Sequence, residues 1–452
     1  MNVTLIHCTA TPPSYDRKEV LKHPCIYGLT GDAEDFVGTS KYQEITELTS
    51  REYSNSNVFS RVIYRSLLGL DWQKQLETDE LVNHICERLK SKKSILIVLN
   101  TKGAVEKLYD ALSRKFNEVS EKDSMAGYID SAGDVSGIES EFEPLLYYLT
   151  TNQCAAHRLD FIEEIKLHLR KIRDKKSDRP LICISTRLIE AGVDVDFDIV
   201  YRDLIGISSI IQSAGRCNRE GKLKDKGIVY LMEYSESNLH NLSIFQSECL
   251  ATRLTLTNID KNNLKYCEED SSYEMTNSIY MLLDEYYKRL YKNINNNSLE
   301  LSYPLEKSFI QQTLLELLST NRRICEYYLQ NHSVNRIKGA LKQSFKLAGE
   351  QFKLIDDQSI TAIVPYNNHR LLEQLYILVD KISDYCNVEY YGQLKHILKQ
   401  LQPYTISIHK NAVSSYEEYL HFELDKKICI LSTEGYNLKT GLKKGEFDNL
   451  IY

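Results

Sequence analysis

Several features that would place the sequence in a familiar class are missing. Its 452 residues contain no apolar run near the roughly 18 residues that a membrane-spanning helix needs, which excludes a helical membrane protein. The first residues have neither a basic start nor a long apolar stretch, so no secretory signal is predicted. Proline is scarce, at 8 residues, whereas tyrosine reaches 31, and this balance argues against long disordered tracts.

Cysteine occurs without any paired pattern. The chain has 11 cysteines, an odd number, and no C-x-x-C pair, so a structural zinc site is not predicted. Scattered thiols in a large chain indicate a reducing compartment, and we expect a cytoplasmic protein. The formal net charge is −7, so bulk charge does not by itself indicate nucleic-acid binding, although a local groove can still be basic.

Alternating strands and helices predict a parallel sheet in the first half of the chain. Short apolar runs predict strands at 94–99, 145–149, 181–185, 199–201 and 228–232. Helical spacing of apolar residues lies between them, at 76–89, 103–116, 155–172 and 207–214. Residues 117–143 show little periodicity and predict a surface loop. This order is typical of an α/β fold with crossover helices.

The character of the sequence changes after about residue 235. Residues 240–400 are mostly helical in pattern, and strand-like runs occur at 360–365, 405–408 and 428–431. We therefore predict an α/β domain followed by a separate, mostly α-helical C-terminal domain.

The strongest chemical signal is the octamer at 212–219. Arg216 and Arg219 are three residues apart, which would place them on one helical face, and Gly215 lets the backbone approach another surface closely. Such a pair can direct two guanidinium groups at one polyanion, as an arginine finger does toward a transferring phosphoryl group. The alternative is a surface helix with two solvated arginines.

A second signal lies upstream, where the predicted strand at 181–185 ends. Ser185 and Thr186 place hydroxyl groups at the C-terminal edge of a parallel sheet, where ligands bind in open α/β sheets. Gly192 permits a tight turn, and Asp194 supplies a carboxylate nearby. The alternative is an ordinary strand–turn–helix segment.

Together the two segments resemble motifs V and VI of superfamily 2 helicases, and more closely the CRISPR-associated type I helicase-nuclease family. The family order S-T-x-L-I-E-A-G-V-D-x-D-F, Y-R-D-L and I-I-Q-x-A-G-R-C-N-R-x-G is similar to residues 185–197, 201–204 and 210–221. Arg187 stands where the family often has glutamine. The resemblance implies catalytic roles and ATP contacts for two groups of residues, which are Gln212, Arg216 and Arg219 for catalysis and Gly192, Asp194 and Gly215 for ATP.

Other segments resemble the same family. Residues 95–102 look like motif IV and residues 149–158 like the motif after it. Residues 8–12 look like motif III, which couples ATP hydrolysis to strand movement, and residues 434–442 resemble the end of the C-terminal domain, especially in the I-C branch. His157 by itself fits a capping or core histidine equally well. The resemblance implies nucleic-acid contacts by Asn100, Thr101, His157, Arg158, Ser185 and Thr186, and coupling by Thr9, Ala10 and Thr11.

The family's earlier motifs are not found in the sequence. No G-x-x-x-x-G-K-[ST] loop cradles phosphates, no strand ends in D-E-x-H or D-E-x-D to hold magnesium, and no His-Asp dipeptide indicates the nuclease. We therefore expect a remnant of the first RecA-like lobe at 1–55, the second lobe at 56–235 and an accessory domain at 236–452. The strand expected at 3–7 would lack neighbours, so residues 1–55 are predicted to be poorly ordered.

The resemblance implies ATP, Mg²⁺, single-stranded DNA and a crRNA-guided surveillance complex as cofactors and partners in antiviral defence. This chain by itself is expected to bind neither ATP nor Mg²⁺ tightly and to be inactive, because arginine fingers act only on a nucleotide that is already held. A separate chain with the first lobe and the nuclease would complete the motor. The alternatives are a non-catalytic DNA- or complex-binding module, a truncated relic, or a helicase of another superfamily 2 branch.

Overall fold

The computed structural model describes residues 61–69, 72, 74–126, 143–190, 192–239, 243–259, 261–275, 279–294, 314–318, 321–331, 343–351, 359–384, 388–425 and 427–443. They belong to two units, one containing Met281–Asp357 and the other containing Asn55–Tyr280 with Gln358–Tyr452. The expected strand at 3–7 and the coupling residues Thr9, Ala10 and Thr11 lie outside the described residues.

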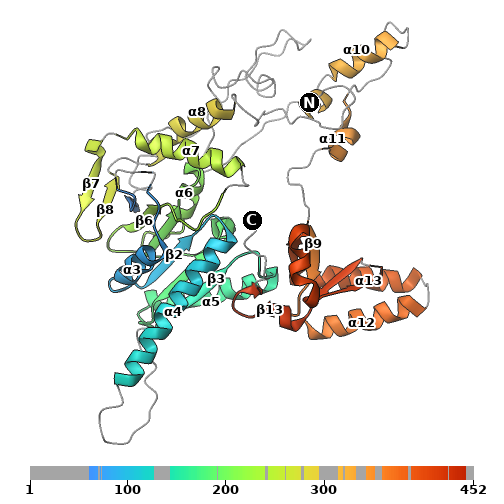
Figure 1. The fold of residues 1–452 in the computed structure, drawn as a ribbon, viewed down its shortest axis with the longest axis horizontal. Helices are drawn as coiled ribbons and strands as arrows, with labels where there is room; N and C mark the ends of the chain where they lie inside the picture. Colours follow the sequence, from blue (N-terminus) through green and yellow to red (C-terminus); the bar gives the residue numbers. More distant parts are fainter. Residues whose placement is uncertain are drawn as a thin grey trace, which may run out of the picture. The chain divides into compact units, whose positions relative to one another are not determined.

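An eight-stranded sheet forms the centre of the larger unit (Figure 1). Its strands are β1 (Val62–Ser66), β2 (Ser94–Val98), β3 (Leu145–Leu149), β4 (Leu181–Ser185), β5 (Ile199–Asp203), β6 (Gly227–Met232), β7 (Leu264–Cys267) and β8 (Ser272–Met275). The order is β3-β4-β2-β5-β6-β1-β8-β7, and the strands from β3 to β1 are parallel. The predicted fold class, a large and mostly parallel sheet with crossover helices, is confirmed.

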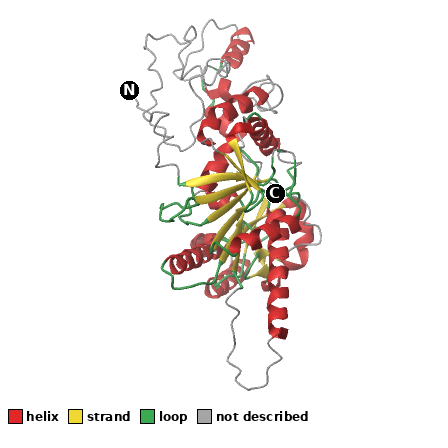
Figure 2. Cartoon of the chain, turned by 90° about the vertical axis from the view of Figure 1, so that its left-hand side faces the viewer, coloured by secondary structure: helices red, strands yellow, loops and turns green. Residues whose placement is uncertain are grey.

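The central strands are buried throughout, which explains their continuous apolar runs. Every residue of β2, β4 and β5 is buried, because helices pack against both faces of a parallel sheet (Figure 2). The connecting elements are α3 (Thr78–Leu89), α4 (Lys102–Ala126), α5 (Ala155–Arg173), the 3₁₀ turn η2 (Arg187–Glu190), α6 (Ile207–Ala214) and α7 (Ser243–Thr257).

One predicted boundary is wrong. Residues 117–126 were expected in a surface loop, but α4 continues through Ala126. No proline or glycine interrupts the sequence between Ala104 and Ala126, and charged helix formers carry the helix on where apolar residues become sparse. Helical propensity therefore extends the element where hydrophobic periodicity has faded.

Three strands of this sheet carry too little apolar periodicity to be predicted. Strand β1 pairs in parallel with β6, and the β7–β8 hairpin continues the sheet antiparallel to β1. Arg65 in β1 donates to Asp270 at 2.6 Å, and the Tyr230 hydroxyl in β6 donates to the same carboxylate at 2.6 Å. These contacts lower the pKa of Asp270 despite its burial. Polar side-chain contacts therefore attach the β7–β8 hairpin to the sheet. The hydrophobic pattern of the sequence cannot indicate such contacts.

A second sheet lies in the C-terminal part of the same unit. Its strands are β9 (Ser359–Ile363), β10 (Thr405–His409), β11 (Leu420–Glu423) and β12 (Ile428–Leu431), in the order β10-β9-β12-β11. The strand-like runs predicted at 360–365, 405–408 and 428–431 are thus strands, accompanied by helices α12 (His369–Asp384) and α13 (Val388–Leu401). A two-stranded hairpin follows, β13 (Tyr436–Asn437) with β14 (Gly441–Leu442).

Alternate residues of this second sheet enter two different cores. Ile428 and Ile430 of β12 pack with α12 and α13, which lie side by side in Figure 1. Cys429 and Leu431, on the other face, pack with the hairpin and with Cys154 just before α5. The C-terminal sheet therefore shares a hydrophobic core with the large α/β domain.

The smaller unit is helical where it is described. It contains α8 (Leu283–Ile294), α9 (Leu314–Leu318), α10 (Arg322–Asn331) and α11 (Phe345–Gln351). Leu317 and Ala348 are buried against each other and join α9 to α11. This agrees with the mostly helical pattern predicted for residues 240–400.

Candidate functional site

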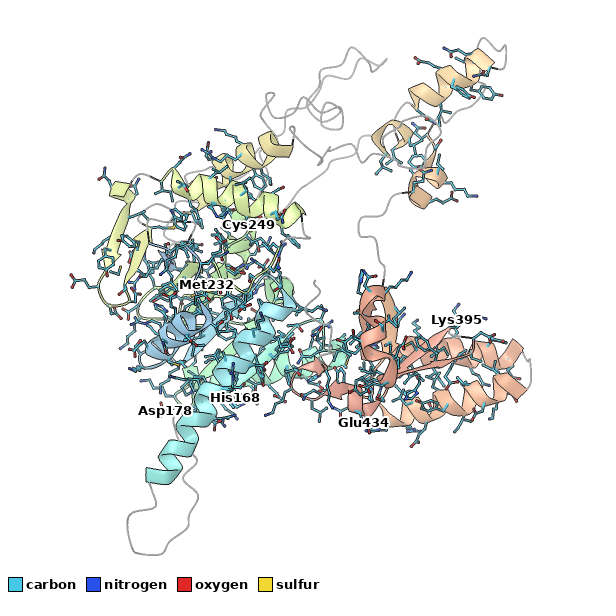
Figure 3. The ribbon with its side chains drawn as sticks, viewed as in Figure 1. His168, Asp178, Met232, Cys249, Lys395 and Glu434 are labelled. Atoms are coloured by element: carbon cyan, nitrogen blue, oxygen red, sulfur yellow. The ribbon has the colours of Figure 1, made fainter. Side chains whose placement is uncertain are left out.

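The C-terminal ends of neighbouring parallel strands meet at one edge of the large sheet. Ser185, the last residue of β4, is in register with Val98 of β2 and Leu149 of β3. Thr186 directly follows β4, and Asn100 lies two residues after the end of β2. Helix α7 packs beside this edge. The Cys249 thiol on α7 donates to the Leu204 carbonyl at 3.1 Å, near Met232 at the end of β6 (Figure 3).

The hydroxyl of Ser185 is used inside the fold. Ser185 is fully buried, and its Oγ donates to the Leu149 carbonyl at 2.9 Å. Its side chain fastens β4 to β3, and the nucleic-acid contact predicted for Ser185 stays a prediction. Thr186 is half-buried one residue further on, and its predicted contact stays a prediction.

Asn100 and Thr101 also have internal partners. Asn100 Nδ2 donates to the Leu204 carbonyl at 2.9 Å, and its Oδ1 accepts from Arg202 at 2.9 Å. Thr101 Oγ1 accepts from the Ala104 backbone at 3.2 Å and so caps α4. Asn100 is half-buried and Thr101 is buried. Both residues shape this edge, and a nucleic-acid contact by either stays a prediction.

A buried ion pair lies beneath the edge, between β5 and η2. Arg202 is fully buried in β5, and its Nη2 lies 3.0 Å from Glu190 Oε1. Glu190 also accepts from Ser209 at 2.7 Å and from Ser213 at 3.0 Å, both on α6. Burial lowers the pKa of Arg202, but the pair and its hydrogen bonds keep the charge compensated. We call Glu190, Arg202, Ser209 and Ser213 the buried network.

This buried network was missed at the sequence level, although a signal was present. The Y-R-D-L segment at 201–204 interrupts an apolar strand with two charged residues in succession. In a strand covered on both faces, each of them must be buried and must find a partner. Asp203 is buried beside Arg202, and burial raises its pKa to about 6.

Arg216 does not lie on a helix, which corrects the sequence prediction. Helix α6 ends at Ala214, and the following turn pairs with Phe197 instead. Phe197 N donates to the Arg216 carbonyl at 2.9 Å, and Asn218 N donates to the Phe197 carbonyl at 2.9 Å. Asn218 has a φ of 43°, a conformation that ends a helix. The arginine turn, residues 215–219, is therefore positioned by the segment that precedes β5.

The guanidinium of Arg216 is held by uncharged acceptors. Its Nε donates to the Ile189 carbonyl at 3.1 Å and its Nη2 to the Glu190 carbonyl at 2.6 Å. The nearby carboxylates pair with other arginines, Asp194 with Arg219 at 2.8 Å and Glu190 with Arg202. Burial and the charge of Arg219 lower the pKa of Arg216. A bound anionic group would stabilise this buried cation, so the arginine turn suits a phosphate.

The other residues predicted for catalysis and for ATP binding lie in or beside the arginine turn. Asp194 is exposed and Arg219 is half-buried, and their ion pair can exchange partners. Gly192 has a φ of 73° and opens the segment that leads to Asp194. Gln212 is exposed on α6, and Gly215 follows the end of that helix. The fold thus brings these predicted residues into one region, and their roles stay predictions.

Arg187, which departs from the family pattern, also finds partners here. Its Nε lies 3.6 Å from Glu190 Oε2, and its guanidinium lies over the Phe245 ring at 5.0 Å. The Arg187 side chain therefore connects η2 to α7. A glutamine at this position would have no charge with which to make these contacts.

His157 is a core residue, the alternative that its sequence context left open, and its nucleic-acid contact stays a prediction. The ring is fully buried and stacks on Tyr366 with 4.3 Å between ring centroids. Burial lowers its pKa to about 4, so the imidazole is neutral. Arg158 is half-buried beside it and donates to the Gln153 carbonyl, and burial lowers its pKa. The contact predicted for Arg158 stays a prediction.

Two absences concern the part of the chain that the structure describes. Within it, no three or more His, Cys, Asp or Glu side chains gather in a way that could hold a metal ion. Within it, no helix has the length and apolar character needed to span a bilayer.

The fold and the site define the class as an α/β domain with an arginine turn beside its central strands. Residues 91–222 match the family model for the C-terminal part of the CRISPR-associated nuclease/helicase Cas3. Residues 91–222 are therefore similar to the C-terminal part of Cas3, in agreement with the resemblance seen in the motifs. The I-C branch stays a prediction.

Individual relatives cover only portions of the chain. A stretch of 43 residues is 54% identical to Cas3 of Haloferax volcanii and covers 10% of this chain and 5% of that protein. A stretch of 202 residues is 28% identical to Cas3 of Methanothermobacter thermautotrophicus and covers 44% of this chain and 20% of that protein. The crystal structure of T. fusca Cas3 with ADP is 14% identical, with a TM-score of 0.43, and covers 82% of this chain and 39% of that one. The chain spans a minor part of each relative.

Proposed function

We propose that this chain supplies the second RecA-like lobe and the accessory domain of an ATP-dependent, single-stranded-DNA-translocating helicase of CRISPR antiviral defence. Arg216 carries the proposal, because it is a buried cation without a carboxylate partner of its own, within the segment that matches the Cas3 family model. Arg216 and Arg219 would stabilise the charge of a transferring phosphoryl group. Asn100, Thr186 and Arg158 would contact the DNA backbone at the sheet edge.

The 452 residues contain no phosphate-gripping loop, so the proposed ATP site needs a second lobe from elsewhere. ATP and Mg²⁺ would be held by that lobe. The crRNA-guided surveillance complex named in the family is the proposed partner that delivers the DNA. A non-catalytic DNA-binding module is the second candidate, and the missing loop is the observation that favours it.

The test mixes this chain with a polypeptide that carries a P-loop lobe and measures ATP turnover with single-stranded DNA. DNA-stimulated hydrolysis should appear in the mixture, and Arg216→Ala should reduce it by about 10³-fold or more. Arg370→Ala removes an exposed arginine on α12, away from the arginine turn, and is the matched control, with full activity expected.

Equal turnover with Arg216→Ala would contradict the proposed role of the arginine turn. Metal-dependent hydrolysis by the chain without any added lobe would show that the site does not depend on a second lobe. DNA binding with no stimulated hydrolysis in any mixture would favour the non-catalytic module.

A further inference from the structure

The hairpin at residues 436–442 contacts a loop of the α/β domain that is distant in sequence. We call residues 436–442 the C-terminal hairpin and residues 150–158, between β3 and the first turn of α5, the β3–α5 loop. Leu442 N donates to the Asn152 carbonyl at 2.8 Å. Glu434 in Figure 3 lies just ahead of this hairpin, and β13 lies next to α5 in Figure 1.

The Tyr436 hydroxyl is the centre of a chain of hydrogen bonds. It accepts from Cys154 N at 3.0 Å and lies 3.0 Å from His157 Nδ1. His157 Nε2 lies 2.9 Å from the Leu438 carbonyl. A carbonyl only accepts, so Nε2 carries the proton of the neutral ring, and Nδ1 must accept from the Tyr436 hydroxyl. The direction of each hydrogen bond in this series is therefore fixed.

A second contact fixes the orientation of Gln153. Its Nε2 donates to the Lys439 carbonyl at 3.1 Å, and its Oε1 accepts from Thr150 N at 3.3 Å. Gln153 is fully buried, and its own carbonyl accepts from Arg158. The hairpin therefore reaches Arg158 through Gln153, because the backbone that orients Arg158 is fastened to Lys439.

The C-terminal hairpin is itself stiff. Asn437 Oδ1 accepts from Lys439 N at 2.7 Å and from Thr440 N at 3.2 Å, which closes the turn. Tyr366, from the C-terminal sheet, donates to Asp160 at 2.7 Å and stacks on His157. The β3–α5 loop and the start of α5 thus pack against both the C-terminal hairpin and the C-terminal sheet.

We infer that Tyr436 and the C-terminal hairpin are positioning elements that hold the β3–α5 loop, and with it Arg158, in the shape that binds the phosphate backbone of single-stranded DNA. The inference rests on the proposed function. It explains why a loop near the proposed DNA path is held by residues from a distant part of the sequence. The Gln153–Lys439 hydrogen bond, for example, joins residues 286 positions apart. Tyr436 acts through the loop and touches no DNA in this arrangement.

The experiment measures binding of the full chain to fluorescently labelled oligothymidylate by anisotropy, across a range of salt concentrations. Arg158→Ala should weaken binding roughly tenfold, as expected for one lost charge-assisted contact. It should also reduce the slope of log affinity against log salt by about 0.7. Tyr436→Phe removes only a hydroxyl and no charge, yet it should reproduce both effects. The double variant should be no weaker than Arg158→Ala alone.

Two controls separate positioning from general damage. Tyr391→Phe removes the hydroxyl of an exposed tyrosine on α13 and should leave affinity and slope unchanged. Hydrogen exchange should accelerate at amides 150–158 in Tyr436→Phe while the amides of β2 and β4 keep their protection.

The outcomes are distinguishable. If wild-type and Tyr436→Phe chains bind with the same affinity and slope while Thr186→Ala weakens binding, the inference is overturned and the proposed function stands. If the wild-type chain binds no oligothymidylate, the proposed DNA contact fails, and the role of Tyr436 fails with it. Unchanged exchange at 150–158 in Tyr436→Phe overturns the inference regardless of binding.

Discussion

At the scale of single residues, burial decides which polar side chains build the fold and which can reach a ligand. Ser185 and His157 carry the atoms that a nucleic-acid contact needs, but both are fully buried and fasten one element to another. Arg202 and Arg216 are both buried arginines. Of these two, Arg202 has a carboxylate partner at hydrogen-bond distance, whereas the guanidinium of Arg216 donates to backbone carbonyls and is suited to an anion.

The buried Glu190–Arg202 pair predicts a large stability effect. Glu190→Gln keeps the shape of the side chain but leaves the Arg202 charge unpaired, so the free energy of unfolding should fall by about 3–5 kcal/mol. Urea unfolding followed by circular dichroism measures this. Glu87→Gln breaks an exposed pair with Lys90 on α3 and should leave the unfolding free energy nearly unchanged. If the two substitutions lower the free energy of unfolding equally, burial does not make the Glu190–Arg202 pair more important than an exposed pair.

His157 predicts a dependence of stability on pH. Its pKa is about 4 in the folded chain and about 6.5 when unfolded. Between these values the unfolded chain binds more protons, so stability falls as pH drops from 6.5 toward 4, by about 3 kcal/mol from this residue. Unfolding free energies of wild type and His157→Gln, measured by urea at several pH values, should converge as the pH falls. A constant difference would contradict the prediction.

The residues that could be predicted from sequence are those that carry a motif. The arginine turn, Asp194 and the strand-end residues were identified by spacing, and the fold does gather Arg216, Arg219 and Asp194. Their geometry could not be predicted, because the turn conformation depends on pairing with Phe197 and not on helical spacing. Partners such as Glu190 for Arg202 depend on tertiary contacts between elements, which local sequence does not encode.

At the scale of elements, continuous apolar runs and helical spacing predicted the central strands and their connecting helices. The strands that were missed include β1, β7, β8 and β11, which are short and carry polar or half-buried residues. Strand β1 is recruited by parallel pairing with β6, and β7 and β8 by polar contacts such as Arg65 with Asp270. Pairing partners rather than intrinsic pattern therefore define these elements.

Gly441 in β14 predicts a sharp effect at the element scale. Its φ is 84°, and a Cβ there would lie 2.2 Å from the Asn152 carbonyl oxygen. Gly441→Ala should therefore separate the C-terminal hairpin from the β3–α5 loop and lower the free energy of unfolding by about 2 kcal/mol or more. Thermal and urea unfolding measure the change.

A matched glycine provides the control for that substitution. Gly392 lies in α13, and a Cβ there would meet nothing within 4 Å. Gly392→Ala should stabilise the chain by up to about 1 kcal/mol, because alanine favours the helix. The prediction for Gly441 is contradicted if both substitutions have the same sign.

At the scale of the whole molecule, the large α/β domain and the C-terminal sheet share one hydrophobic core. Cys154, which precedes α5, is buried together with Cys429 and Leu431 of the second sheet. Together with the hydrogen bonds of Tyr436, this core makes the two parts of the larger unit a single packed body. The smaller unit has its own contact between Leu317 and Ala348.

Three buried cysteines can report on this shared core. Cys183 lies in β4, Cys154 between the two parts and Cys429 in the second sheet, and all three are buried. In increasing urea, all three thiols should become reactive in one transition, located by mass spectrometry after thiol labelling. Reaction of Cys429 at clearly lower urea than Cys183 would show that the second sheet unfolds separately.

The hydrogen bonds of the buried network also connect the two ends of the site. Asn100 Oδ1 accepts from Arg202, Arg202 pairs with Glu190, and the Glu190 carbonyl accepts from Arg216. A substitution at Glu190 or Arg202, in the middle of this series, should therefore disturb the Asn100 end and the Arg216 end together. Substitutions at the two terminal members, Asn100 and Arg216, should each disturb one end of the site alone. Substitutions at Glu190 or Arg202 test whether a change at one end reaches the other.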